Sequence, residues 1–185
     1  ELEESIVAAG QGITMYEIVR SLPRYLEQSG LDISIEDVFN QVAATGLGPF
    51  LTSLLDDNAI SEEIYKLSIE QDRPALQKMY ADCFSDNTID ALIFPATLIM
   101  PFKLQGQGTH MHKGNEISDF AASGHNVQPA SIGGSPGLTV TAGISQSRIP
   151  VALGFDGPMG SDRKLMAIGA AYEAIRPPIP APGIA

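Results

Sequence analysis

The chain lacks several features that would assign it to a class at once. Its 185 residues include one cysteine, Cys83, which excludes an intrachain disulfide and offers no metal-binding spacing. We therefore expect a reducing, cytoplasmic setting. The longest apolar run, Ala91 to Pro101, contains Pro95 and is too short to span a bilayer, and no signal peptide is visible. These absences predict a globular protein that does not cross a membrane.

Basic charge is scarce in the first half of the chain. Residues 1–90 hold 17 of the 22 acidic residues and 5 of the 11 basic ones, whereas the Gly- and Pro-rich remainder is nearly neutral. A nucleic-acid-binding protein needs a basic patch against the phosphates, so we expect no such partner. The chain also begins at Glu1 within an acidic segment, which predicts a fragment of a longer polypeptide.

Apolar residues at helical spacing dominate residues 1–89 and predict a mainly helical region. Met15, Val19 and Leu22 share one helix face, with Pro23 either kinking this helix or starting a second one. Ser34, three residues before an aspartate, resembles a capping box, and a serine before two glutamates at 61–63 predicts another helix start. We interpret the acidic side chains as the solvated faces of these helices.

Residues 90–176 differ from the first half in that they contain continuous apolar runs, which predict buried strands. The apolar run 91–94 predicts one strand, and the runs 138–144 and 149–155 predict two more, joined by a tight turn. Residues 101–128 show little periodicity, which favours a long loop that lines or covers a site. A helix capped by Ser161 would close the region, followed by a Pro-rich tail over 177–185. The pattern predicts an α/β fold in one domain over residues 1–185.

The glycine-rich stretch from Gly133 to Gly137 formally matches G-x-S-x-G, the nucleophile elbow of serine hydrolases. Ser135 is a poor nucleophile, however, because Pro136 has no backbone amide to act as an oxyanion donor. An elbow also needs a strand before it and a helix after it, whereas a strand is predicted to follow. We interpret the stretch as a flexible loop that forms the wall of a pocket.

Other motifs are equally weak. His110 and His112 alternate in a glycine-rich loop without an adjacent acidic cluster, so we interpret them as solvated histidines rather than metal ligands. No G-x-G-x-x-G sits between a predicted strand and helix. The residues alone thus predict no metal and no cofactor, and they indicate pocket walls without a catalytic group.

Three segments of the second half occur in a known order: IDALIFPAT, then NVQPASIGGSPGLTVTAG, then IPVALGFDGPMGSDRKLMAIGAAYE. This order resembles the C-terminal portion of the amidase signature family. The run GFDGPMGSDRKLMAIG and the N-x-x-P step at Asn126 and Pro129 are most similar to the mandelamide and indoleacetamide hydrolase branch. The chain departs from that branch at residues 131–135, where the shape of the pocket would be set, and at Ala152.

The resemblance implies a mixed β-sheet core flanked by helices, which is incomplete without the N-terminal portion of the same enzyme. That portion carries the family's triad of a Ser, a second Ser in a cis peptide and a Lys. No position here matches the triad, so we expect no catalytic residue in this chain. The resemblance further implies hydrolysis of a small, aryl-containing amide through an acyl-enzyme.

Strand ends and the glycine-rich stretch are where this chain would contact a substrate. For each such residue, ordinary packing is the alternative. The candidate substrate-binding residues are Thr97, Ile99, Met100, Phe102, Ile132 and Ser135.

Two other functions stay open at this point. The same family includes one component of a transamidase that converts misacylated glutamyl-tRNA, and the chain could instead be a non-catalytic binding or interaction domain. The expected partners are the N-terminal portion with the triad and a small amide substrate, and a homodimer is an assembly that the sequence leaves open.

Overall fold

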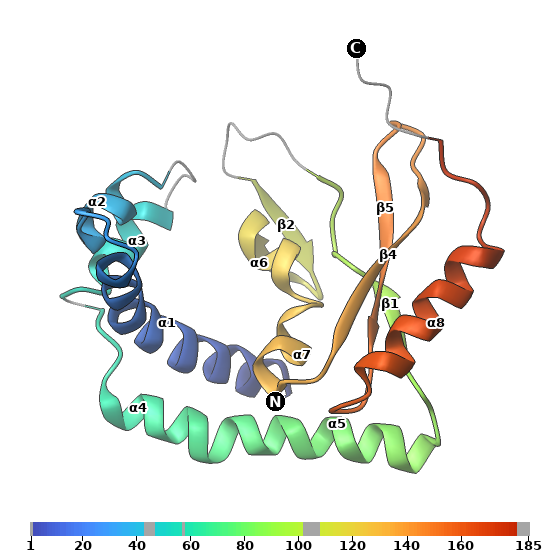
Figure 1. Cartoon of the computed structure of the whole chain (residues 1–185), viewed down its shortest axis with the longest axis horizontal. Helices are drawn as coiled ribbons and strands as arrows, with labels where there is room; N and C mark the ends of the chain where they lie inside the picture. The colour runs from blue at the N-terminus through green and yellow to red at the C-terminus, as the bar shows by residue number, and fades with distance from the viewer. Residues whose placement is uncertain (1, 43–46, 57, 102–107, 181–185) are drawn as a thin grey trace. The chain divides into compact units, whose positions relative to one another are not determined.

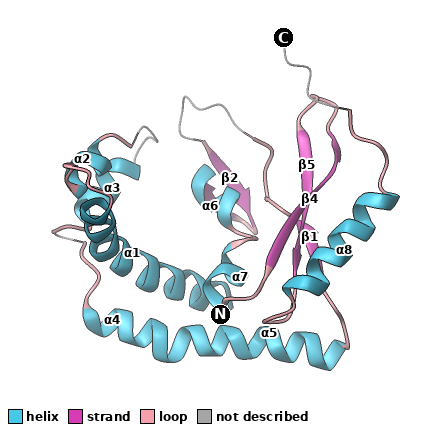
Figure 2. Ribbon diagram, viewed as in Figure 1, coloured by secondary structure: helices cyan, strands magenta, loops and turns pink. Residues whose placement is uncertain are grey.

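The computed structural model describes residues 2–42, 47–56, 58–101 and 108–180. They divide into two compact units, a helical one up to Leu76 and a second one from Gln77 that contains the strands (Figure 1). None of the described helices combines the length and the apolar composition of a membrane span. Helices make up the first unit, and the strands all belong to the second (Figure 2).

The first helix, α1 (Leu2–Gln28), runs without interruption through Pro23. The sequence left a kink or a second helix open at this proline. Apolar residues of α1 before the proline pack on one core, and Leu26 beyond it is also buried, which offsets the loss of a backbone hydrogen bond. The core consists of four buried residues, and the α1 residues beside it include Met15 and Val19. The four are Ile35, Phe39, Leu51 and Leu54.

The capping box before α2 (Ile35–Asn40) is confirmed. The Ser34 hydroxyl accepts a hydrogen bond from the Asp37 amide at 3.0 Å, and the Asp37 carboxylate accepts one from the Ser34 amide at 3.3 Å. This reciprocal pair satisfies two amides that the helix itself cannot pair. Helix α3 (Leu47–Ser53) follows.

Three helical elements then follow one another in sequence: α4 (Glu62–Leu67), the π-helical turn η1 (Ser68–Asp72) and α5 (Arg73–Asn87). The Ser61 hydroxyl caps α4 by accepting from the Ile64 amide, as predicted. The helix passes Pro74 without a break because the Arg73 amide bonds to the Ser68 carbonyl in the wider π pattern just before it. Ser68 is buried against α1, where a Cβ at Gly12 would lie 2.1 Å from its hydroxyl oxygen.

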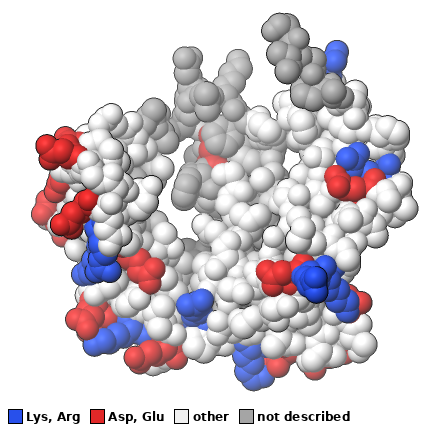
Figure 3. Space-filling model, viewed as in Figure 1, with Lys and Arg blue, Asp and Glu red and all other residues white. Residues whose placement is uncertain are grey.

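Acidic side chains of the helical unit lie at its surface, as predicted. Glu36 and Asp37 of α2 and Glu62 and Glu63 of α4 are exposed, and Figure 3 shows acidic side chains over these helices. In α4, Glu62 forms a 2.7 Å ion pair with Lys66 one turn later. Such exposed pairs contribute little to stability, so this surface serves mainly for solvation.

The three predicted strands are all present and form one antiparallel sheet in the order β1-β5-β4. The turn between β4 and β5 is tight, with the Arg148 amide donating to the Ser145 carbonyl at 2.9 Å. Within the described residues, each outer strand pairs with β5 alone, so each has one unpaired edge. The bounds are β1 (Leu92–Pro95), β4 (Gly137–Ile144) and β5 (Pro150–Asp156).

One face of this sheet is covered by the closing helix α8 (Asp162–Ile175). Its buried Leu165 packs with Val140 of β4 and Phe155 of β5. Ser161 stands at the start of α8, but its hydroxyl forms no capping bond, so that part of the prediction is wrong. Ile175, the last residue of α8, is 82% exposed.

The prediction of a long loop over residues 101–128 is also wrong in part. The described portion contains a hairpin of β2 (Thr109–His112) and β3 (Asn115–Ser118), followed by the short helix α6 (Asp119–Gly124). The two turn residues of the hairpin, Lys113 and Gly114, both have positive φ, at 49° and 82°. This is the backbone that a two-residue hairpin turn requires.

Candidate functional site

The loop after β1 carries three of the predicted pocket residues. Thr97 is exposed, and its hydroxyl donates a hydrogen bond to the Ile99 carbonyl at 2.8 Å. Ile99 is half-buried, and Met100 is 43% exposed. The loop thus presents one hydroxyl oxygen, which can still accept a bond, beside two apolar side chains. Phe102, the fourth predicted residue of this segment, lies outside the described residues.

This loop is held by the segment that follows the hairpin. The Leu98 amide donates to the Ala122 carbonyl of α6 at 3.4 Å. The Asn126 side-chain amide donates to the Pro95 carbonyl at the end of β1, at 2.7 Å. The N-x-x-P step of the sequence therefore has a structural role, since its asparagine fastens the end of a strand.

The glycine-rich stretch carries the other two predicted residues, Ile132 and Ser135, both half-buried. Backbone hydrogen bonds hold this stretch on several sides. Helix α7 (Gln128–Gly133) ends at Gly134, whose φ of 79° is the left-handed value that favours glycine, and the Ser135 amide donates to the Ala130 carbonyl.

Two further bonds fasten this stretch to its neighbours. The Gln77 side chain of α5 donates to the Gly133 carbonyl at 2.8 Å, and the Gly157 amide donates to the Pro136 carbonyl at 3.0 Å. A helix precedes Ser135 and a strand follows it, which is the reverse of a nucleophile elbow. The sequence-based rejection of Ser135 as a nucleophile is consistent with this order.

The predicted residues form two groups rather than one continuous wall. The glycine-rich stretch enters β4 at Gly137, which pairs with Asp156, whereas the loop after β1 begins beside Ala152. Strand β5 rises on the order of 13 Å between these two residues. Thr97, Ile99 and Met100 therefore lie at one end of the sheet, and the segment of Ser135 enters at the other end.

Histidines that the sequence assigned to a solvated loop lie on strand β2 and have partners. The His110 ring nitrogen Nε2 lies 2.5 Å from an oxygen of Asp119. The rings of His112 and His125 approach to 4.9 Å between centroids. Their spacing by two was the signal of a strand, since alternate residues of a strand share a face. Among the described residues, no group of three or more His, Cys, Asp or Glu side chains is placed to hold a metal ion.

A buried acid stands at the end of β5 near the glycine-rich stretch. Asp156 is 3% exposed and accepts a hydrogen bond from the Tyr80 hydroxyl of α5 at 3.1 Å. Burial raises the pKa of the Asp156 carboxyl, and the bond from Tyr80 opposes that rise. Burial and the nearby carboxylate also raise the pKa of Tyr80, which keeps its hydroxyl protonated as a donor. The pair joins α5 to the sheet.

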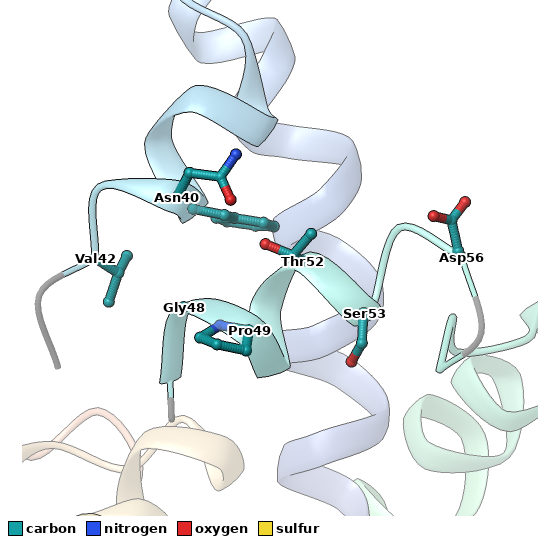
Figure 4. A pocket seen from close by; sticks show the side chains of 8 residues that line it. Asn40, Val42, Gly48, Pro49, Thr52, Ser53 and Asp56 are labelled. Carbon is teal, nitrogen blue, oxygen red and sulfur yellow. The ribbon is translucent and has the colours of Figure 1, made fainter. Parts of the chain in front are cut away.

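A hollow of about 480 Å³ lies in the helical unit between α2 and α3 (Figure 4). Phe39 and Pro49 give it apolar walls, and the buried Thr52 hydroxyl has no hydrogen-bond partner among the described residues. None of the predicted substrate-binding residues that the structure describes lines it. The hollow therefore adds no support to the predicted pocket.

Known proteins share much of this sequence and fold. Residues 2–166 match the family model described as Amidase. The chain belongs to the amidase family. The resemblance to the C-terminal portion of the amidase signature family, and to its mandelamide and indoleacetamide hydrolase branch, is confirmed by the relatives that follow.

Two relatives within the amidase family are hydrolases. Indoleacetamide hydrolase from Agrobacterium vitis is 31% identical over 172 residues, which cover 93% of this chain and 37% of that protein. Mandelamide hydrolase from Pseudomonas putida is 26% identical over 189 residues, which cover 95% of this chain and 35% of that protein. The chain thus spans little more than a third of the length of these relatives.

Solved structures confirm the α/β amidase signature fold of the chain. A crystal structure described as an amidase superposes with a TM-score of 0.71 at 21% identity, covering 95% of this chain and 36% of the other. A bacterial aryl acylamidase of the amidase signature family superposes with a TM-score of 0.66 at 20% identity, covering 93% and 34%. These similarities concern the fold alone.

Proposed function

We propose that this chain is part of an amide hydrolase that cleaves a small, aryl-containing amide. The observation that carries the proposal is its 31% identity, over 93% of its length, to an indoleacetamide hydrolase. The mandelamide hydrolase relative also acts on an amide whose name indicates an aromatic acyl group. An indole or phenyl ring needs apolar walls, and burial of each apolar side chain against it contributes about 1.5–3 kcal/mol.

In this proposal the catalytic residues of the hydrolase lie outside the chain. The resemblance implies a Ser–cisSer–Lys triad that forms an acyl-enzyme, releases ammonia or an amine and is then deacylated by water. Ser135 does not replace that nucleophile, because Pro136 follows it and its amide already bonds to Ala130. The chain's own contribution is to form part of the acyl-group pocket.

Residues that line this pocket are proposed from the two ends of the sheet. At the end of β1 the side chains of Ile99 and Met100 supply apolar surface, and the Thr97 hydroxyl can accept a bond from a polar group of the substrate. The remaining proposed lining residues are Phe102, Ile132 and Ser135.

The N-terminal portion of the same enzyme is the proposed partner. Two observations support it: each outer strand of the described sheet has an unpaired edge, and the chain spans 37% of its relative's length. Unpaired edges with exposed apolar residues, such as the 60% exposed Ile93 of β1, favour aggregation. Residues 1–185 expressed alone should aggregate, and co-expression with a portion that carries the triad should restore solubility. A cooperative, monomeric melt of residues 1–185 alone would instead support a self-sufficient binding domain.

The second candidate function is that of one component of a transamidase-type amidotransferase. One component of the glutamyl-tRNA(Gln) amidotransferase from Nocardia farcinica is 28% identical over 153 residues, which cover 79% of this chain. The identity and the coverage are lower than for the indoleacetamide hydrolase, and the GPMGSDR run favours the simple hydrolase.

The deciding assay measures ammonia or amine release by the complete protein from phenylacetamide, indoleacetamide and an anilide. We expect turnover of at least one of them without ATP or tRNA. Met100→Ala should raise the KM for the aryl amide, whereas Met166→Ala, at a 68% exposed position of α8, should leave it unchanged. Absence of turnover with all three amides would overturn the proposed hydrolase.

A further inference from the structure

The carboxylate of Asp119 fastens the base of the β2–β3 hairpin to helix α6. One oxygen accepts a bond from the Gly108 amide at 2.7 Å, and the other lies 2.5 Å from His110 Nε2. The Asp119 amide in turn donates to the Gly108 carbonyl at 3.1 Å. A Cβ at Gly108 would lie 2.7 Å from both carboxylate oxygens, so no side chain fits between them. The carboxylate is thus fixed against the backbone before β2.

The other end of α6 holds the loop that follows β1. Ala122, which is fully buried, accepts the bond from the Leu98 amide, and Asn126 donates to the Pro95 carbonyl just beyond the helix. Helix α6 has six residues, so its first turn and its last turn are nearly the same turn. A shift at Asp119 must therefore move the carbonyl to which Leu98 bonds.

We propose that the His110–Asp119 pair positions the loop 97–100 and so determines which acyl group the enzyme accepts. This inference rests on the proposed function, because it assigns that loop to the acyl-group pocket. Both residues act through α6 and are positioning residues. The substrate class they select is an amide with a bulky aromatic acyl group, which contacts Ile99 and Met100, as opposed to a small aliphatic amide that does not reach them.

The exposure of the two partners distinguishes this pair from ordinary core packing. The Asp119 side chain is 12% exposed, whereas the His110 side chain is 36% exposed. If position 110 were fully buried, an apolar side chain could hold the hairpin equally well by packing. A histidine here instead supplies a hydrogen-bond donor of fixed length, so the distance between β2 and α6 is set by a bond rather than by packing volume.

The test compares two substrates with variants of the complete enzyme. His110→Ala should raise the KM for indoleacetamide about tenfold, equivalent to ~1.4 kcal/mol. The KM for acetamide and both kcat values should stay within about twofold. His110→Gln retains a donor and should recover part of the loss. The control Lys164→Gln, which removes the exposed ion pair with Asp90 in the same unit, should change neither KM.

A second measurement does not depend on activity. In His110→Ala, hydrogen–deuterium exchange of the peptide that contains Leu98 should be faster than in the wild type, and in Lys164→Gln it should not. An unchanged ratio of the two KM values in His110→Ala would overturn the positioning role. Unchanged exchange at Leu98 would overturn it as well. If the wild type hydrolyses no amide, the proposed function fails separately, and the exchange at Leu98 still decides whether the pair positions the loop.

Discussion

Gly154 is a position in the sheet where an added methyl group should have a measurable effect. It lies on the central strand β5, opposite Phe94 of β1. A Cβ at Gly154 would lie 2.4 Å from Cε2, 2.9 Å from Cζ and 3.0 Å from Cδ2 of the Phe94 ring. Carbon atoms in favourable contact are about 3.5–4.0 Å apart. The ring therefore occupies the space that an alanine side chain would need.

We expect Gly154→Ala to lower the free energy of unfolding by about 1–3 kcal/mol, the usual effect of overpacking. The ring cannot withdraw easily, since it is attached to a strand that is bonded to β5. Strand β5 cannot move alone either, because it pairs with a strand on each side. Urea-induced unfolding of the complete protein, followed by fluorescence and circular dichroism, measures the change from the midpoint and slope.

The matched control is Gly143→Ala on β4. A Cβ there would meet only Val151 Cγ2, at 4.0 Å, which is ordinary van der Waals contact. This variant should stay within about 0.5 kcal/mol of the wild type. The double variant Phe94→Val with Gly154→Ala removes the ring and should show a coupling energy of about 1 kcal/mol or more in favour of the pair. If Gly154→Ala is as stable as Gly143→Ala, the close packing of Phe94 on Gly154 is refuted.

Three further predictions concern stability. Burial raises the folded-state pKa of the Asp156 carboxyl above its unfolded value. The carboxyl's contribution to stability is therefore full at low pH and is lost as the pH rises through the folded pKa. Asp156→Asn should remove this pH dependence of the free energy of unfolding, measured by denaturant unfolding from about pH 3.9 upward. Gly134→Ala places a side chain at φ 79° and should destabilise by about 1–2 kcal/mol, read from the same unfolding curves. Ser34→Ala removes the capping box and should destabilise by ~1 kcal/mol, whereas Ser34→Asp should retain most of the stability, and equal losses would contradict the capping role.

Local signals predicted most of the secondary structure. The caps at Ser34 and Ser61 and the strands at 138–144 and 149–155 depend on residues close in sequence, and the structure has them nearly as predicted. The hairpin β2–β3 was missed because its turn is Lys113-Gly114, a weaker signal than Asn-Gly or Asp-Gly. Its strands are also polar, so they lack the apolar alternation of a typical strand.

The candidate site was harder to predict than the fold. The bonds that hold it join residues far apart in sequence, such as Asn126 to Pro95 and Tyr80 to Asp156, and no periodicity reveals such pairs. The glycine-rich stretch was expected to be flexible from its composition alone. One of the bonds that hold it comes from the side chain of Gln77, which belongs to a helix more than fifty residues earlier in the sequence.

The π-helical turn at 68–72 joins α4 to α5 and makes α5 sensitive to insertions and deletions before it. One extra residue is accommodated there, and each helical residue corresponds to about 100° of rotation about the axis. Loss of a single codon in this turn would restore regular α-helical bonding upstream of Pro74. With no wider turn before it, Pro74 would meet a regular α-helical ladder, in which its ring clashes with the carbonyl four residues earlier and bends or ends the helix. A deletion expected to favour regular helix formation would thereby interrupt the helix ahead of Gln77 and Tyr80.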